Sequence, residues 1–525
     1  MEQITVTESA TSAVGKINRN FANVNSEPEV VGESVFLGNF VQNGNWARQQ
    51  DILCPVDYGI TYIFTMPEGI VAKIEYGTTN SLGSTSVNIF DGDTFTFPQA
   101  ALAQRISFAR YQNGTVALLT VADAQSMIDS GSIRVSFDDV DVVEHNRDKE
   151  AMLAALTKLS FNESNSTSSQ YYYKRAALIV HTSDLHGDAQ RAYNMMRYAK
   201  HYGIDECVVS GDVTLYSKDG ADYVFAAAKS AGVHVLFSMG NHEAQGLTPS
   251  AGVMFSTYLS NDAERLGYLK AADTITDRGY YYYDLSAKKI RFIVLDQYDG
   301  GVYGGQGKAG RISQGQVDFL LNALRAPAGY GIVVIMHSPE NSLSKPTELS
   351  KFNTTTPLSG NGGDNYSYAS SGVYNDASRP ISKIIDAFIS RGTYSGSWTA
   401  TYNGSSETVN VDADFTGYDS TVEFICYLSG HIHTDNIGYL SGTNNRQLMI
   451  NITSGNGHVS GGDNFGFAGV DDIPRRGVGV TQDAFNVYAI DREKKQVRIL
   501  RIGSNVKKDM TMRDFLIADY SPSAS

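Results

Sequence analysis

The sequence predicts a mixed protein in which an all-β domain of jelly-roll type precedes a layered α/β domain. Two observations lead to this prediction. From about residue 30 to 143, short runs rich in β-branched and aromatic residues are separated by Gly, Asp, Asn and Pro, as in sandwiches of short strands. From about residue 173 onward, apolar strands alternate with helical patterns, as in sheets covered by helices. A chain of 525 residues is also too long for one hydrophobic core.

Three segments precede the α/β domain. Residues 1–29 contain a short stretch with apolar residues at helical spacing, which is too short to be stable alone and predicts a docking or assembly segment. Residues 30–143 form the predicted β-sandwich, with carbohydrate binding and assembly as its two expected roles. Residues 144–172 combine one apolar helical face with the polar run NESNSTSSQ, which predicts a helix followed by a linker.

Residues 173–505 carry the predicted α/β domain, and residues 506–525 a C-terminal tail. A helix is expected over DAQRAYNMMRYAKHYG, with Asp188 as N-cap and Gly203 as its stop. The run YYYYD at 280 indicates a strand whose aromatic rings pack against neighbours. The runs AFNVYAID and QVRILRIG, joined by REKK, predict a hairpin. The other expected strands are RAALIVHTSD, ECVVSGD, VHVLFSMGN, IRFIVLD, GIVVIMHS, VEFICYLSGH and RQLMINIT.

An insertion over residues 340–415 interrupts this alternation. It is rich in Gly, Ser, Asn and Tyr, and one helix is expected in it at ISKIIDAFISRG. Segments of this length beside a site are commonly lids or substrate-binding elements. We therefore predict that the insertion is lid-like and selects the substrate.

Charge and composition exclude several classes of protein. The net charge of -14 predicts a surface that repels nucleic acid and anionic membranes. The first residues show no basic start followed by an apolar stretch, so no signal peptide is expected, and no apolar run is long enough to span a bilayer. Three widely spaced cysteines fit neither a disulfide framework nor a thiolate metal site. The expected protein is soluble.

Side chains able to bind metal fall directly after predicted strands. The set is Asp184 and His186 in SDLHGD, Asp212 in SGDV, Asn241 and His242 in GNHE, His337 in MHSP, and His431 and His433 in GHIH. Strand ends on one edge of an α/β sheet converge in space, so these dispersed segments can form one pocket. His181 and His458 also lie near strand ends, but the pattern gives them no role.

Imidazole, carboxylate and amide donors without thiolate favour Mn, Fe, Zn or Co, with Mg or Ca as alternatives. This set holds more candidate ligands than one ion can bind. A carboxylate that bridges two divalent cations about 3.5–4 Å apart would place them to activate a water and polarise a phosphoryl oxygen. The donor set therefore predicts hydrolysis of phosphate esters.

At these residues the chain resembles the calcineurin-like metallophosphoesterase family, whose blocks are D-x-H, G-D, G-N-H-[DE], a single His, and G-H-x-H. All five blocks occur in order within about residues 175–502. The resemblance implies a two-sheet α/β sandwich with helices on both outer faces (αββα) and a dinuclear metal site. It assigns Asp184, His186 and His433 to one metal and Asn241, His337 and His431 to the other. Asp212 would bridge them.

The resemblance also implies roles for residues that touch the substrate. His242 would not bind metal; it would lie over the phosphate and donate a hydrogen bond or a proton to it. Asn241 would also bind the substrate. Glu243 would orient His242. The expected catalytic residues are thus His242, Glu243 and Asp212.

A second resemblance concerns the biological setting. The stretch AVGKINRNFANVN is similar to N-terminal segments of phage tail and tail-fibre proteins. This implies a virion tail protein that cleaves phosphate-containing surface polymers, with other tail proteins or copies of itself as partners. Two alternatives stay open: a structural or receptor-binding virion protein with little activity, and a cytoplasmic nucleotide or protein phosphatase.

Overall fold

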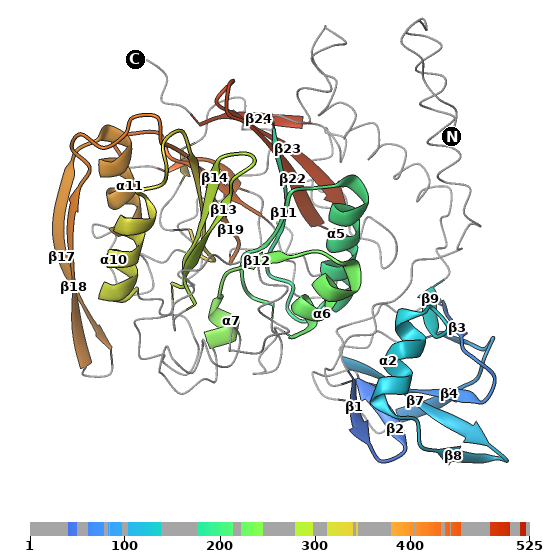
Figure 1. The fold of residues 1–525 in the computed structure, drawn as a ribbon. Coiled ribbons are helices and arrows are strands. Elements are labelled where there is room, and N and C mark those ends of the chain that lie inside the picture. Colours follow the sequence, from blue (N-terminus) through green and yellow to red (C-terminus); the bar gives the residue numbers. More distant parts are fainter. Residues whose placement is uncertain are drawn as a thin grey trace, which may run out of the picture.

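A computed structural model shows the fold (Figure 1). The residues that the structure describes are 40–49, 61–77, 82, 85–96, 103–137, 176–213, 222–244, 279–297, 312–339, 343–344, 380–402, 405–431, 436–440, 443–452, 484–503 and 515–520. The predictions for residues 1–29 and 144–172 lie outside these ranges, as does His433. Within them, no helix has the length and apolar character needed to cross a bilayer.

The N-terminal part is rich in strands, as the sequence predicts. A six-stranded sheet has the order β1-β2-β7-β4-β5, with β8 on β7, and a second sheet has the order β6-β3-β9. Their shared core contains fully buried aromatic rings such as Phe64 and Phe108. The strands are β1 (Phe40–Asn43), β2 (Trp46–Gln49), β3 (Thr61–Thr65), β4 (Ile70–Gly77), β5 (Thr85–Ile89), β6 (Thr94–Thr96), β7 (Ala103–Gln112), β8 (Thr115–Ala117) and β9 (Arg134–Phe137).

One helix, α2 (Val121–Asp129), is an addition to the expected all-β arrangement. The run TVALLTV reads as one strand, but β8 ends at Ala117. Thr120 then caps the helix, because its side chain accepts a hydrogen bond from the Asp123 backbone N–H. A local cap thus overrides the strand pattern that precedes it.

The C-terminal part contains two large mixed sheets that face each other. The first has the order β12-β11-β10-β22-β23-β24, and the second the order β13-β14-β15-β19-β21-β20-β16. The first is built from β10 (Ala177–Thr182), β11 (Glu206–Val209), β12 (Val235–Phe237), β22 (Ala484–Asp491), β23 (Gln496–Gly503) and β24 (Phe515–Asp519). The second is built from β13 (Tyr281–Leu285), β14 (Ile290–Val294), β15 (Gly331–Ile335), β16 (Leu343–Ser344), β19 (Glu423–Ser429), β20 (Asn436–Leu440) and β21 (Leu448–Asn451).

Helices cover the outer faces of both sheets, which confirms the predicted αββα sandwich (Figure 1). On one side lie α5 (Ala189–Tyr202) and α6 (Asp222–Ala231), and on the other α10 (Gln314–Ala323) and α11 (Pro380–Ser390). The helix expected after Asp188 is α5, which Asp188 and the left-handed Gly203 cap as predicted. The expected hairpin is β22–β23, and the helix expected in the insertion is α11.

Alternation along strand β14 shows why the second sheet is buried on both faces. Phe292 and Val294 belong to the core between the sheets, whereas Ile293 and Leu295 belong to the core under α10 and α11. Tyr281 of β13 is fully buried and exchanges hydrogen bonds with the backbone of Phe237, so packing is confirmed for the tyrosine run at 280.

The structure contains a hairpin and an edge strand that the sequence did not predict. The hairpin β17 (Thr393–Tyr402) and β18 (Ser405–Asp414) packs on α10 and α11 as a further outer layer, so the described part of the insertion supports the core. The rest of residues 340–379, apart from β16, lies outside the described ranges, and its role as a lid stays a prediction. Strand β24, within the expected C-terminal tail, completes the first sheet beside β23.

Candidate metal centre

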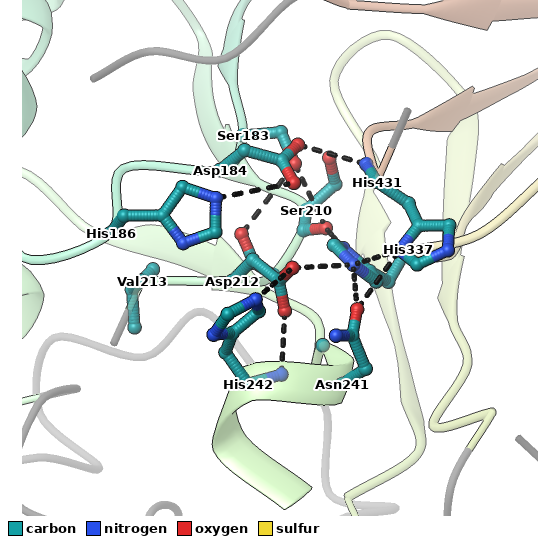
Figure 2. Close-up of polar contacts among 12 residues, drawn as sticks. Ser183, Asp184, His186, Ser210, Asp212, Val213, Asn241, His242, His337 and His431 are labelled. Atoms are coloured by element: carbon teal, nitrogen blue, oxygen red, sulfur yellow. Dashed lines mark hydrogen bonds and ion pairs between the residues drawn. The ribbon is translucent and has the colours of Figure 1, made fainter. Parts of the chain in front are cut away.

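The candidate ligands lie where parallel strands from both sheets end. Asp184 and His186 follow β10, and Asp212 follows β11. The short helix α7 (Asn241–Ala244) begins at Asn241, just after β12. From the second sheet come His337, after β15, and His431, after β19. Figure 2 shows these side chains pointing toward one another around Asp212. His433, the remaining predicted ligand, lies outside the described residues.

Four of these residues have a left-handed backbone. The φ angles are 53° at Asp184, 45° at His186, 52° at Asp212 and 73° at His431. Such conformations cost about 1–3 kcal/mol each for residues other than Gly and persist where the surroundings enforce them. Here the Asp184 N–H donates to the Gly211 carbonyl, and the His186 N–H to the Asp212 carbonyl, both at 3.0 Å. The two motif turns therefore hold each other in these conformations.

The first group of donors is the tighter one. His337 Nε2 lies 3.0 Å from Asn241 Oδ1, 3.1 Å from Asp212 Oδ2 and 3.1 Å from His431 Nδ1. His431 Nδ1 lies 2.9 Å from the same Asn241 oxygen. Two imidazole nitrogens, an amide oxygen and a carboxylate oxygen therefore surround one point. This is the set that the family resemblance assigns to the second metal together with the bridging carboxylate.

The orientation of the His337 ring suits a metal ligand. Its Nδ1 lies 2.8 Å from the Ser210 carbonyl oxygen, which can only accept, so Nδ1 carries a proton. In the neutral ring the lone pair then sits on Nε2 and points at the other donors. Histidine ligands in proteins are typically oriented through their second nitrogen in this way. The residues present therefore fit a cation at this point.

Electrostatics of the buried centre favour positive charge beside Asp212. Burial raises the pKa of Asp212, but the charges of His337 and His242, a hydrogen bond from His337 and the charge of His186 outweigh burial and hold that pKa well below its usual range. Burial lowers the pKa of His337, but the carboxylates of Asp212 and Asp184 and its hydrogen bonds raise that pKa to about 9. The surroundings that favour a proton on His337 Nε2 equally favour a cation there.

A second group shares Asp212. One donor atom each from His186, Asp212 and His242 lies within 4.8 Å of the others, just as one each from Asp212, His337 and His431 does. His242 Nε2 is 3.8 Å from Asp212 Oδ2, and His186 Nε2 is 4.0 Å from Asp184 Oδ1. Asp212 is the only described residue common to both groups, as a bridging carboxylate would be. The second group contains His242, which the resemblance excludes from the ligands, and does not contain the predicted ligand Asp184.

His242 combines a fixed backbone with a partly exposed side chain. Its backbone N–H donates to Asp212 Oδ1 at 2.8 Å, which fixes the start of α7 on the bridging carboxylate. Its ring meets the ring of His186 edge to face, with centroids 4.7 Å apart. The side chain is 16% exposed, whereas that of His337 is fully buried. His242 can therefore reach a molecule that enters the site.

Glu243 has a structural task that the motif alone does not reveal. Its carboxylate is fully buried and accepts backbone hydrogen bonds from Gly240 at 2.7 Å, Asp212 at 2.9 Å and Val213 at 2.8 Å. It thereby joins the turn after β11 to the turn after β12. Its predicted action on the His242 side chain stays a prediction.

Glycines allow the turns to approach this closely. A Cβ on Gly240 would overlap the backbone nitrogen and a carboxylate oxygen of Asp212, and a Cβ on Gly430 would overlap Ser183 and Asp184. At Gly430 this close approach lets the His431 N–H donate to Asp184 Oδ2 at 2.8 Å. The motif glycines are therefore required by contacts among the ligands.

Sequence reasoning missed the residues behind His337. The Ser210 carbonyl, which orients that ring, also accepts from Ser183 Oγ at 3.1 Å. The Ser210 hydroxyl lies 2.8 Å from Nε2 of the fully buried His181, whose Nδ1 lies 3.0 Å from the Tyr488 hydroxyl. Only the position of His181 near a strand end hinted at this support, because contacts across strands distant in sequence leave no local pattern.

Comparisons with known proteins address the same part of the chain. A family model described as calcineurin-like phosphoesterase matches residues 177–435, which include every candidate ligand. A comparison with curated proteins gives no match. A crystal structure of a dimetal phosphatase from Danio rerio is 13% identical, covers 66% of this chain and 99% of its own, and has a TM-score of 0.37. A crystal structure of a protein from Thermus thermophilus is 12% identical, covers 46% and 91%, and has a TM-score of 0.24.

Proposed function

Because residues 177–435 place the chain in the calcineurin-like phosphoesterase family, we propose that it hydrolyses phosphomonoesters or phosphodiesters at a dinuclear metal site. The observation that carries this proposal is the position of Asp212 in both donor groups. One carboxylate shared by two sets of nitrogen and oxygen donors is what a pair of adjacent cations requires. Nitrogen and oxygen donors without thiolate favour Mn, Fe, Zn or Co, with Mg or Ca as alternatives.

Two divalent cations would supply Lewis-acid polarisation of the phosphoryl oxygen and a water of lowered pKa. The protein would contribute the geometry. Asp212 would bridge, Asn241, His337 and His431 would hold one cation, and Asp184, His186 and His433 the other. The left-handed turns and the Glu243 carboxylate would keep these donors in place when substrate binds.

His242 would act on the substrate. Its partial exposure and its backbone anchor on Asp212 support this role, since the ring can face the phosphate while its main chain stays fixed. It would donate a hydrogen bond to the phosphoryl oxygen and a proton to the leaving oxygen. The same Nε2 also lies close enough to the carboxylate of Asp212 for both to bind one cation. Direct metal binding by His242 is therefore the competing interpretation.

Metal analysis and kinetics on purified protein test this function. The wild-type chain should bind two equivalents of a divalent transition metal and hydrolyse a bis-aryl phosphate. His242→Ala should lower kcat by about 10²–10⁴-fold, the usual contribution of a general acid, while the metal content stays at two. Loss of metal in this variant would show that His242 binds the metal directly. His234→Ala, at an exposed histidine outside the site, is the matched control. Protein without metal, or a His242→Ala variant with the wild-type rate, would contradict the proposal.

The biological target is a separate proposal. We propose a virion tail protein that acts on phosphate-containing surface polymers, supported by the sequence of its N-terminal segment. Activity on teichoic-acid polymers, compared with nucleotides and glycerophosphodiesters, tests the substrate, and mass spectrometry of particles tests the location. Preference for nucleotides and absence from particles would favour a cytoplasmic phosphatase, whereas a metal-free chain found in particles would favour a structural or receptor-binding role.

A further inference from the structure

The hairpin β17–β18 has one packed face and one exposed face. The two strands pair antiparallel from Thr393↔Asp414 to Tyr402↔Ser405. On the inner face, Val409, Val411 and Ala413 are buried with α10 and α11. On the outer face, small polar residues of the two strands bond to each other, Ser395 to Asp412 and Thr399 to Thr408. The hairpin is thus a firmly seated outer layer with two strand edges.

The outer edge of β18 is occupied by side chains. The Gln314 amide donates to the Asn410 carbonyl at 2.9 Å and accepts from the Asn410 N–H at 2.7 Å, as a neighbouring strand would. Arg325 donates to the Asp414 carbonyl at 2.6 Å. The backbone of Asn410 therefore points away from β17. By the alternation of antiparallel strands, its partner in register, Ser397, also points away from β18.

The outer edge of β17 follows from the same alternation. The residues Thr393, Ser395, Ser397, Thr399 and Thr401 direct their backbone N–H and C=O groups outward. Among the residues that the structure describes, none pairs with this edge, and the hairpin remains a two-stranded sheet. Figure 1 shows the hairpin as the outermost layer on this side. One edge is therefore covered, and no described strand covers the other.

The sequence of β17, TYSGSWTATY, has none of the usual protection of an open edge. Proteins discourage edge-to-edge pairing with charged residues, proline, bulges or very short strands. This strand is ten residues long and contains neither a charged residue nor proline. The adjacent strand β18 carries Glu407, Asp412 and Asp414. Of the two strands, the uncharged one is thus the one whose outer edge no described strand covers.

We propose that β17 pairs antiparallel with β17 of a second copy of this chain. The five outward residues are centred on Ser397, so a two-fold axis there pairs Ser397 with itself, Ser395 with Thr399 and Thr393 with Thr401. Such pairing is self-complementary, as closed dimers require. With a net charge of -14, two copies repel each other over most of their surfaces, and this pairing brings uncharged strands together while the acidic β18 strands lie outermost.

Light scattering on the metal-loaded full chain tests the dimer. The wild-type protein should have a mass in solution twice that of one chain. Ser397→Pro removes one outward N–H without removing a hydrogen bond inside the hairpin, and should give a monomer with an unchanged rate of phosphoester hydrolysis. Ser397→Ala keeps the N–H and should stay dimeric. A monomeric wild type, or a Ser397→Pro dimer as stable as the wild type, would overturn the proposal.

Cross-linking provides a second readout that does not depend on tolerance of proline. Ser397→Cys should form a disulfide-linked dimer on mild oxidation, because paired residues across adjacent strands lie about 5.5 Å apart at Cα. Thr408→Cys has its side chain on the same exposed face but on β18, one strand further from the axis, and should not cross-link. Equal cross-linking at both positions, or none at Ser397→Cys, would show that β17 does not meet its copy.

Discussion

At the scale of single residues, the centre is held by backbone contacts as much as by ligands. The left-handed conformations of Asp184, His186, Asp212 and His431 direct four donors inward from turns that otherwise would favour glycine. Their cost is offset by hydrogen bonds between turns, and the buried carboxylate of Glu243 accepts two of these, from Asp212 and Val213. It accepts a third from Gly240 in its own turn. The positions of the metal ligands should therefore depend on Glu243, which is not itself a predicted ligand.

Glu243→Gln tests this dependence. An amide nitrogen in place of one carboxylate oxygen faces at least one of the backbone N–H donors, so the turn that carries Asp212 loses part of its support. We expect metal affinity to fall by about 10–100-fold, as for other residues that orient ligands. Titration calorimetry with Mn or Zn measures this fall. Glu493→Gln, at an exposed glutamate far along the chain, is the control. Equal affinities in the two variants would assign Glu243 no positioning role.

At the scale of elements, sequence patterns predicted what is local. Apolar runs marked the strands that carry ligands, and the Asp188 and Gly203 caps marked α5. The motif residues lie within a few positions of strand ends, so convergence at one sheet edge followed from topology. Helix α2 was missed because the Thr120 cap acts against a strand-like pattern. Strand β24 was missed because its place in the sheet depends on partners distant in the sequence. The hairpin β17–β18 is local, since only Asn403 and Gly404 separate its strands, and this Asn-Gly hairpin signal was overlooked in a segment expected to be a lid.

Strand β24 illustrates such a distant dependence. Tyr520, just after it, is 2% exposed, and its hydroxyl lies 3.1 Å from Glu423 Oε1 at the start of β19. Tyr520→Ala should lower the free energy of unfolding by about 3–5 kcal/mol, the usual cost of truncating a buried aromatic ring. Tyr520→Phe keeps the ring and should cost about 1 kcal/mol, the value of one hydrogen bond. Urea denaturation measures both.

Equal losses in the two Tyr520 variants would mean that the hydrogen bond to Glu423, and not the buried ring, stabilises this corner. Hydrolysis of phosphate esters at low temperature should be unchanged in both, because Glu423 begins β19 and His431 follows its opposite end. A loss of activity would instead show that the sheet edge is coupled to the metal centre.

At the scale of the whole molecule, the centre links the two sheets. Asp184, His186, Asp212 and Asn241 follow strands of the first sheet, whereas His337 and His431 follow strands of the second. A cation bound by donors from both sheets binds the folded state and not the separated chain segments. Metal binding should therefore stabilise the fold as well as support hydrolysis.

Thermal unfolding with and without metal tests this linkage. A metal present at a hundred times its dissociation constant should add about 2.7 kcal/mol to the free energy of unfolding, so Tm should rise by several degrees over the chelated protein. Asp212→Asn removes the carboxylate shared by both donor groups and should abolish the rise in Tm. Tyr520→Phe should have a lower Tm without metal but show the full rise when metal is added. An equal rise in all three proteins would place the stabilising ion away from the junction of the two sheets, because only a site that contains Asp212 can separate these variants.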